Sequence, residues 1–353
     1  MLFELYDTEI NPGFASCLLG VLIGLAFGVA AQLSRFCLRR SVVEFTVGQF
    51  PAFGVWLMAF SVALLGTQAL VLDGQMSFVG HRFHASALPI LTVLVGGALF
   101  GTGMVLTRGC ISRLTVLSAT GNLRAAICIV VFAIVAHAAL KGVLAPLRLG
   151  LGAVTLDVGE FANLGNLPGG TVLWVAIVLV LLAAVIYRSG ARPVHLLLGA
   201  AIGTLVPLGW FGTGVFLQDA FDPIPKASIS FTAPWADTLF WSVASSSIAA
   251  GFGTGLVGGT LLGSFLTAAS RGELALQSFE APKQTMRYLL GAAMMGLGGV
   301  LAGGCTVGAG LAGTASLSLS AVLVLATMIG SAWFASHMID GRPARLRHSE
   351  PGR

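Results

Sequence analysis

The chain has 353 residues, of which 56% are apolar and only 9% are charged, and its mean hydropathy is +0.92. Soluble proteins average about 45–50% apolar and about 25% charged residues, so this composition excludes a soluble globular protein. The net charge of +5 does not indicate a nucleic-acid-binding protein, because the basic residues lie in short loops between apolar stretches. The composition therefore predicts an all-α polytopic membrane protein that forms a single membrane domain, 1–353.

The N-terminal segment 1–10 holds three acidic residues and no basic residue before the first apolar stretch. It lacks the basic region of a signal peptide, so we expect the first apolar stretch to be retained as a helix. About twenty apolar residues cross a bilayer as one helix. We predict about nine such helices, at 14–33, 50–72, 88–106, 124–144, 171–187, 193–217, 238–268, 288–303 and 317–339.

The basic residues favour one orientation, since loops on the inner side of a membrane are enriched in Lys and Arg. With the N-terminus outside, the inner loops and tail hold Arg35, Arg39, Arg40, Arg108, Arg113, Arg124, Arg188, Arg192, Arg271, Lys283, Arg287 and the segment 340–353. The outer loops are then acidic or mixed, with Asp157, Glu160, Asp219, Asp222, Asp237 and Lys226. We therefore predict an outer N-terminus and a cytoplasmic C-terminus.

The chain contains an internal repeat. Segment 96–110 aligns without a gap on segment 291–305, with eight of fifteen residues identical and Gly-Cys at the end of both. A weaker match links 18–24 to 197–203. With the predicted orientation the two copies are antiparallel, as in transporters built from inverted repeats and broken helices. We expect a 4+4 repeat (halves 14–144 and 193–339, connector 171–187); chance similarity between glycine-rich helices is the alternative.

The five cysteines fall into two groups. No C-x-x-C pair exists, so the zinc, thioredoxin-like and haem-attachment patterns are absent from the sequence. Cys17 and Cys128 lie within apolar stretches, where a thiol packs as a small hydrophobic group. Cys37, Cys110 and Cys305 lie instead in loops rich in Arg, Gly, Ser and Thr, at 34–40, 107–113 and 302–310. These three loops are the candidate site.

Non-helical backbone at membrane depth is tolerated only inside protein or along a wet cavity. Short helices that restart after such loops would direct their N–H groups toward an anion. Thiols are soft, weak contacts, and several weak sites in series allow an ion to leave as well as to enter. The candidate path residues are Cys37, Cys110, Cys305, Arg35, Arg108, Gly109, Ser112, Gly304 and Thr306, with Ser34 as a further hydroxyl donor.

Each assignment has an alternative. Arg39, Arg40 and Arg113 fit anchors at the cytoplasmic edge, and the same reading stays open for Arg35 and Arg108. A thiolate path also suits soft metals such as Cu(I), but no histidine lies near the thiols and no Met-x-x-x-Met array is present. His81 and His84 lie in a predicted outer loop, where we expect them to be solvated. We expect no cofactor, since no nucleotide-binding motif is present.

The loop residues resemble those of the YeeE/YedE family, bacterial inner-membrane proteins of sulfur transport that include thiosulfate uptake proteins. The matching motifs are RFCLRR at 35–40, RGCISR at 108–113, GNLRA at 121–125 and GGCTVGAGL at 303–311. The resemblance implies an hourglass-like inverted-repeat fold in the inner membrane. It also implies a central path that passes thiosulfate inward by relay between cysteines that match Cys37, Cys110 and Cys305.

The chain departs from a symmetric pattern at two places. No cysteine in the second half mirrors Cys37, and Arg108 stands where the second copy has Gly303. Thiosulfate, sulfite, another sulfur oxyanion and a selenium oxyanion therefore all stay open as substrates. The resemblance also implies a small cytoplasmic sulfur-carrier protein as a partner.

The alternative to transport is a membrane thiol oxidoreductase or sulfurtransferase. Such an enzyme needs an attacking thiol close to a resolving thiol. The nearest loop cysteines, Cys37 and Cys110, are 73 residues apart, so only the fold can bring them together. A structural membrane subunit fits poorly with three thiol-bearing breaks. We therefore favour a transporter without enzyme activity.

Overall fold

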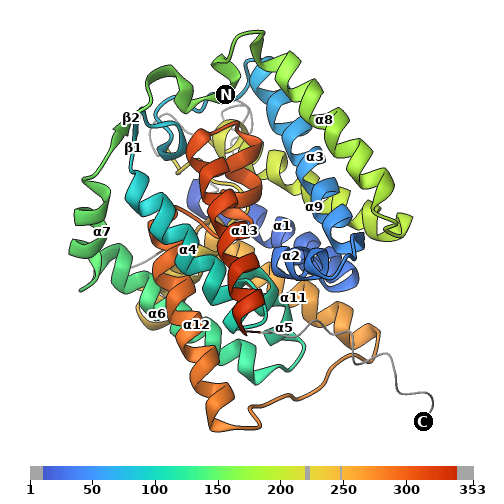
Figure 1. Cartoon of the computed structure of the whole chain (residues 1–353). Coiled ribbons are helices and arrows are strands. Elements are labelled where there is room, and N and C mark those ends of the chain that lie inside the picture. Colours follow the sequence, from blue (N-terminus) through green and yellow to red (C-terminus); the bar gives the residue numbers. More distant parts are fainter. Residues whose placement is uncertain (1–10, 219–222, 247–248, 340–353) are drawn as a thin grey trace.

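The computed structural model describes residues 11–218, 223–246 and 249–339 (Figure 1). The predicted outer segment 1–10, the predicted cytoplasmic tail 340–353, and the acids Asp219 and Asp222 lie outside the described residues. Within the described part the fold is almost entirely helical. One short antiparallel pair joins β1 (Ala87–Leu88) to β2 (Leu156–Asp157), with Ala87 opposite Asp157.

The α-helices, in chain order, are α1 (Pro12–Ser34), α2 (Leu38–Thr46), α3 (Pro51–Leu72), α4 (Ile90–Leu106), α5 (Ile111–Ala119), α6 (Leu123–Lys141), α7 (Ala145–Gly152), α8 (Gly170–Arg188), α9 (Pro193–Phe211), α10 (Thr232–Val243), α11 (Phe252–Ser270), α12 (Pro282–Leu301) and α13 (Leu319–Ile339). Short 3₁₀ turns occur at η1 (Arg82–His84), η2 (Gly159–Ala162) and η3 (Leu164–Asn166). Two π-helical turns occur at η4 (Gly212–Phe216) and η5 (Gly308–Gly313).

Eight described segments are long and apolar enough to cross a membrane: 12–46, 51–72, 90–119, 123–141, 170–188, 193–216, 252–270 and 319–339. The protein is therefore an all-α, multi-pass membrane protein. The expected single helix 238–268 is wrong, because α10 ends at Val243 and α11 begins at Phe252. The expected helix 288–303 is part of α12, which begins six residues earlier with a turn that carries Lys283 and Arg287.

Glycines allow the central helices to pack backbone against backbone. A Cβ added to Gly24 of α1 would collide with the backbone of Leu256 on α11, and one added to Gly259 would collide with the backbone of Val21. Small residues at interfaces let membrane helices approach closely, because packing rather than the hydrophobic effect drives their association in lipid. The α1–α11 interface accordingly has no room for side chains at these glycines.

The glycine contacts also give the direction of the helices that lead to two of the cysteine loops. Gly96 of α4 lies against Gly298 of α12, whereas Gly103 lies against Gly291. Contact positions that rise along one helix fall along the other, so α4 and α12 are antiparallel. The two helices that precede the Gly-Cys loops therefore run toward those loops in opposite directions.

Helix–helix contacts made by the first half of the chain have counterparts when the helices of the two halves are exchanged. Helix α1 packs on α11 as α9 packs on α3, and α6 packs on α12 as α13 packs on α4. Helix α8 lies at the edge of the bundle beside α3 and α9 (Figure 1), with Val175 as its only buried described residue. The large buried rings Phe27, Phe100 and Phe132 belong to α1, α4 and α6. The core therefore lies among the central helices, with α8 outside it.

Candidate functional site

Each of the three cysteine loops leaves the helical conformation through one left-handed residue, two positions before its thiol. These residues are Arg35 (φ 54°), Arg108 (φ 57°) and Gly303 (φ 72°). This conformation is natural for glycine but costs other residues about 1–2 kcal/mol. Two arginines are therefore held in an unfavourable backbone conformation at the same place in two loops.

A short helical segment follows each thiol. Cys37 immediately precedes α2, and Cys110 immediately precedes α5; neither helix has a side-chain hydrogen bond at its cap. After Cys305 the chain enters the π-helical turn η5, a geometry that is often found at functional sites. The N–H groups of a first helical turn have no partner within the helix, so these ends can bind an anion.

The fold brings two of the three loop thiols together. Cys37, Cys110 and Cys305 are all buried, and none forms a disulfide. The thiols of Cys37 and Cys110 face each other within hydrogen-bonding range. The Cys305 thiol instead accepts a hydrogen bond from the Gly308 N–H at 3.4 Å. The first and second loops thus meet at their sulfur atoms.

Hydroxyl groups complete the surroundings of Cys110. Its Sγ lies 3.2 Å from Ser112 Oγ, and Thr306 of the third loop lies beside it. Thr306 Oγ1 is buried and has no well-aligned hydrogen-bond partner among the described residues. Thr306 follows Cys305 in sequence, so the third loop also reaches the thiol pair. The contact of Thr306 with the Cys110 thiol is weak, because sulfur is a weak hydrogen-bond partner, and a bound polar ligand would accept a stronger hydrogen bond.

The two predicted loop glycines differ in their surroundings. A Cβ added to Gly304 would approach the Ala309 backbone nitrogen to 2.7 Å, which is too close for any side chain. A Cβ added to Gly109 would meet only side-chain atoms of Arg113 and Leu114, at 3.6 Å. Gly304 is therefore required for the packing of its loop, whereas Gly109 has ordinary space around it.

The arginines are arranged differently from the sequence prediction. Arg35 and Arg108 are exposed at the loops, whereas Arg113, interpreted from sequence as an anchor, is only partly exposed. Its guanidinium donates to the Ala31 carbonyl oxygen at 3.4 Å and lies within electrostatic reach of the Cys37 and Cys110 thiols. No carboxylate forms an ion pair with it among the residues that the structure describes.

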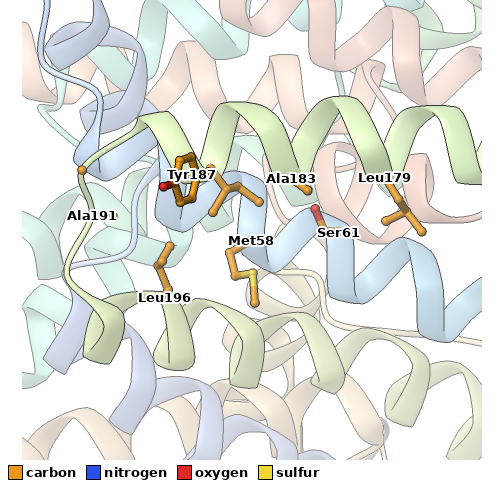
Figure 2. Close-up of a pocket in the computed structure, with 9 residues that line it drawn as sticks. Met58, Ser61, Leu179, Ala183, Tyr187, Ala191 and Leu196 are labelled. Atoms are coloured by element: carbon orange, nitrogen blue, oxygen red, sulfur yellow. The ribbon is translucent and has the colours of Figure 1, made fainter.

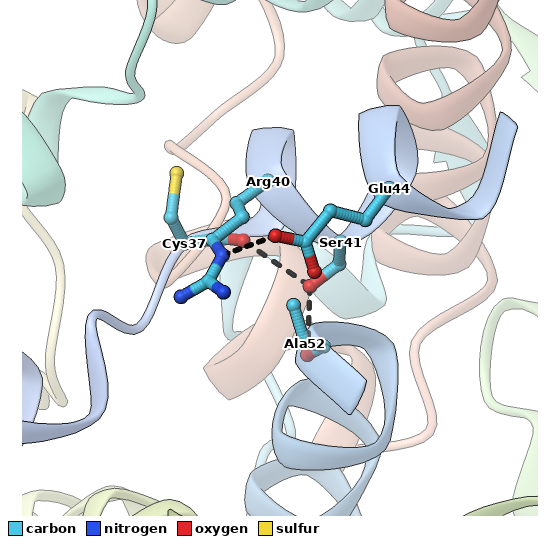
Figure 3. A network of polar contacts seen from close by, with 5 residues as sticks. All are labelled: Cys37, Arg40, Ser41, Glu44 and Ala52. Atoms are coloured by element: carbon cyan, nitrogen blue, oxygen red, sulfur yellow. Dashed lines mark hydrogen bonds and ion pairs between the residues drawn. The ribbon is translucent and has the colours of Figure 1, made fainter. Parts of the chain in front are cut away.

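A repeated spacing could have revealed Arg113, because both Cys37 and Cys110 are followed by arginine at the third position. Arg40, the equivalent residue in the first loop, forms an ion pair with Glu44 one helical turn later. Figure 3 shows the Cys37 thiol pointing away from the Arg40 guanidinium. Of the two arginines, Arg113 is therefore the one whose charge lies close to both thiols.

The turn η1 packs against Gly303 of the third loop and against the segment 313–318 that follows it. The Phe83 ring lies over Gly313, the Phe83 carbonyl oxygen accepts from Ser318 Oγ at 2.5 Å, and His84 Nε2 lies 3.0 Å from Ser316 Oγ. The prediction that the two histidines are solvated is wrong, because both are half-buried. Burial, followed by the charge of Arg82, lowers the pKa of His81 to about 4, and burial also lowers the pKa of His84.

Two cavities lie away from the thiols. One of about 540 Å³ is bounded by polar groups of η1 and neighbouring loops, including His84, Asn163 and Ser316. Another of about 560 Å³ lies among α3, α8 and α9, and Figure 2 shows its largely apolar lining. Neither is lined by a cysteine, so both are separate from the loop-cysteine site.

The remaining cysteines have packing environments. Cys128 is buried in α6, with its thiol 3.7 Å from the Tyr288 carbonyl oxygen. Cys17 of α1 is half-buried, and its carbonyl oxygen lies against Gly255 of α11. Neither thiol belongs to a loop.

A multi-pass helical protein whose broken helices bring buried thiols together has the architecture of a transporter. Residues 33–334 match the model of the Sulphur transport family, and the chain belongs to that family.

Two relatives align over nearly the whole chain. The thiosulfate transporter TsuA of Escherichia coli (strain K12) is 26% identical, over 94% of this chain and 97% of its own length. The thiosulfate transporter TsuA of Spirochaeta thermophila is 24% identical, over 89% of this chain and 96% of its own length. The family match at residues 33–334 includes all three cysteine loops of the candidate site.

Proposed function

We propose that the protein transports thiosulfate across the membrane, through a path that passes between the three cysteine loops. The observation that carries the proposal is the meeting of Cys37, Cys110 and Thr306, which come from three separate breaks in the helices. Membership of the Sulphur transport family and the names of the two relatives support the same substrate class.

The chemistry of thiosulfate matches the groups at the site. Its terminal sulfur is soft and accepts weak S–H hydrogen bonds, for which Cys37 and Cys110 are suitable donors. Its oxygen atoms accept strong hydrogen bonds, which Thr306 Oγ1, Ser112 Oγ and the first N–H groups of α5 can donate. Arg113 supplies positive charge close to the thiols, and no carboxylate among the described residues forms an ion pair with it. The site thus offers separate groups for the two ends of the ion.

In this mechanism the ion moves between weak sites. Cys305 is the third sulfur position, and its separate location fits a step before or after the Cys37–Cys110 pair. Exposed Arg35 and Arg108 would attract the ion at the loops, while Gly304 keeps the Cys305 loop closely packed. Weak contacts in series allow release as well as binding. No step of this relay requires a covalent bond to sulfur or enzyme activity.

We further propose that the chain forms one membrane domain with an inverted 4+4 repeat. The antiparallel crossing of α4 and α12 supports it, as do the packing pairs that exchange the two halves. Helix α8 would be the connector outside the repeat. The basic loops favour an outer N-terminus and a cytoplasmic C-terminus. The family resemblance supports a bacterial inner membrane, inward transport and a cytoplasmic sulfur-carrier protein as partner.

The test is uptake of radiolabelled thiosulfate into proteoliposomes that contain the purified protein. We expect uptake above that of empty liposomes, reduced by unlabelled thiosulfate but not by sulfate, which lacks the terminal sulfur. Competition by sulfite or selenium oxyanions instead would identify another substrate. No uptake of any of these ions by a folded protein would contradict the proposal.

Thiol chemistry is the second candidate function, and one observation favours it. Cys37 and Cys110, which are far apart in sequence, lie within hydrogen-bonding range in the fold. A sulfurtransferase would need both sulfur atoms as nucleophiles, whereas a hydroxyl can partly replace a thiol in weak contacts. Residual uptake in a Cys37→Ser variant would therefore favour the transport relay over covalent transfer.

A further inference from the structure

Cys37 and Cys110 form a close pair of reduced thiols. They lie in different loops, are buried at 7% and 1% exposure, and face each other within hydrogen-bonding range. Both are free in the structure. To form an S–S bond of about 2.05 Å, the two sulfur atoms must leave this contact and move closer together.

The surroundings of the pair are those of reactive thiols. The backbone N–H groups of Arg40 and Cys110 are directed toward Cys37 Sγ, and Ser112 Oγ lies 3.2 Å from Cys110 Sγ. The guanidinium of Arg113 is near both sulfurs. Helix N-termini and neighbouring cations are typical of cysteines that react with oxidants.

We propose that Cys37 and Cys110 are a redox-sensitive dithiol, which a hydroperoxide converts to a disulfide that reversibly stops transport. One thiol attacks the peroxide, breaks its O–O bond and becomes a sulfenic acid, with release of one water from hydrogen peroxide. The second thiol then displaces the hydroxyl as a second water. Two thiols lose two electrons and two protons in total, and the peroxide accepts both.

The disulfide would affect the path in two ways. It would join the loop before α2 to the loop before α5, and it would remove both S–H donors from the proposed thiosulfate site. The inference about transport rests on the proposed function. The inference about the disulfide does not, since it depends only on the distance and surroundings of the two thiols.

The sequence provides a direct assay for the cross-link. Trypsin cleavage after Arg35, Arg39, Arg108 and Arg113 releases the peptides FCLR (36–39) and GCISR (109–113). After treatment with hydrogen peroxide and alkylation of free thiols, we expect mass spectrometry to detect these peptides joined, with loss of two hydrogens. Dithiothreitol should separate them again. The cross-link should persist in Cys305→Ser and be absent from Cys37→Ser.

Uptake measured on the same samples tests the second half of the proposal. We expect thiosulfate uptake to fall in proportion to the cross-linked fraction and to return with dithiothreitol. Absence of the joined peptides from folded, peroxide-treated protein would overturn the proposal. Full cross-linking with unchanged uptake would overturn it as well, because the disulfide would then leave the path open.

The two proposals fail in distinguishable ways. If untreated protein takes up no thiosulfate, the proposed function is wrong, while the joined peptides still decide whether the pair is redox-sensitive. If untreated protein transports and no joined peptides form, the function stands and the redox proposal is wrong.

Discussion

The loop after α4 and the loop after α12 share a backbone course but differ in side chains. Each follows a glycine-rich helix and passes through one left-handed residue, which is Arg108 in the loop after α4 and Gly303 in the loop after α12. The regular helix α5 follows Cys110, whereas the π-helical turn η5 follows Cys305. The break at Arg108 therefore costs conformational energy, whereas the break at Gly303 uses a residue that adopts this conformation readily.

The difference indicates a division of roles. The loop after α4 supplies polar groups near the thiol pair, namely Ser112 and Arg113. The loop after α12 supplies close packing, since Gly304 and Gly308 leave no space for a side chain. Two related segments can therefore keep one backbone geometry while only one of them carries the charge at the site.

Among the substitutions that test this division of roles, Arg113→Gln is expected to have the largest effect on thiosulfate uptake. Loss of a charge near the ion should reduce thiosulfate uptake about tenfold, a factor that corresponds to about 1.4 kcal/mol. Arg124→Gln is the matched control, because the Arg124 guanidinium bonds Gln277 at an exposed position. Initial uptake rates in proteoliposomes measure both. Equal rates for the two variants would show that Arg113 is only an anchor.

The packing role of the loop after α12 is tested by Gly304→Ala, with Gly109→Ala in the loop after α4 as its control. Overpacking against the Ala309 backbone should lower the free energy of unfolding by about 1–3 kcal/mol. The space around Gly109 should limit its change to about 0.5 kcal/mol. Thermal unfolding in detergent compares the midpoints. A lower midpoint for Gly109→Ala than for Gly304→Ala would contradict the assignment of roles.

The turn η1, which packs against the loop after α12, should make the stability of the protein depend on pH through His81. Its pKa is about 4 in the folded protein and 6.5 ordinarily, so below pH 6.5 the unfolded chain binds a proton that the folded chain does not. Stability should therefore fall as the pH decreases from 6.5 to 4 and change little above 6.5. Unfolding midpoints across this range should flatten in His81→Gln. An unchanged slope in that variant would contradict the role of His81.

The smallest effect is expected from Arg108→Gly, which makes the loop after α4 resemble the loop after α12. Relief of the left-handed conformation should raise the free energy of unfolding by about 1 kcal/mol. If Arg108 attracts the ion, the same variant should take up thiosulfate more slowly at low substrate concentration. A more stable variant with unchanged uptake would show that Arg108 has no part in the path.

Much of the fold could be predicted because the length of each apolar stretch can be read directly from the sequence. Most of the predicted helices match observed ones, but the boundary between α10 and α11 was missed because segment 244–251 contains no proline or charged residue that would mark a break. The three cysteine loops were visible as breaks in apolar stretches. The partnership of Cys37 with Cys110 was not, because it depends on how two loops meet in space.

Arg113 shows the same limit for the site. In sequence it is one of several basic residues near a helix end, and such residues are typical anchors. The position of α5, which places Arg113 beside two thiols, distinguishes it from Arg124, whose guanidinium bonds Gln277. The repeated Cys-x-x-Arg spacing was the available signal.

The central claim is that the loop thiols form the path, and paired cysteine variants test it most directly. Cys110→Ala removes the thiol that faces Cys37 and Ser112, whereas Cys17→Ala removes a half-buried thiol in α1 outside the loops. With equal amounts of folded protein in proteoliposomes, thiosulfate uptake should be lost in Cys110→Ala and retained in Cys17→Ala. Undiminished uptake in Cys110→Ala would contradict the claim.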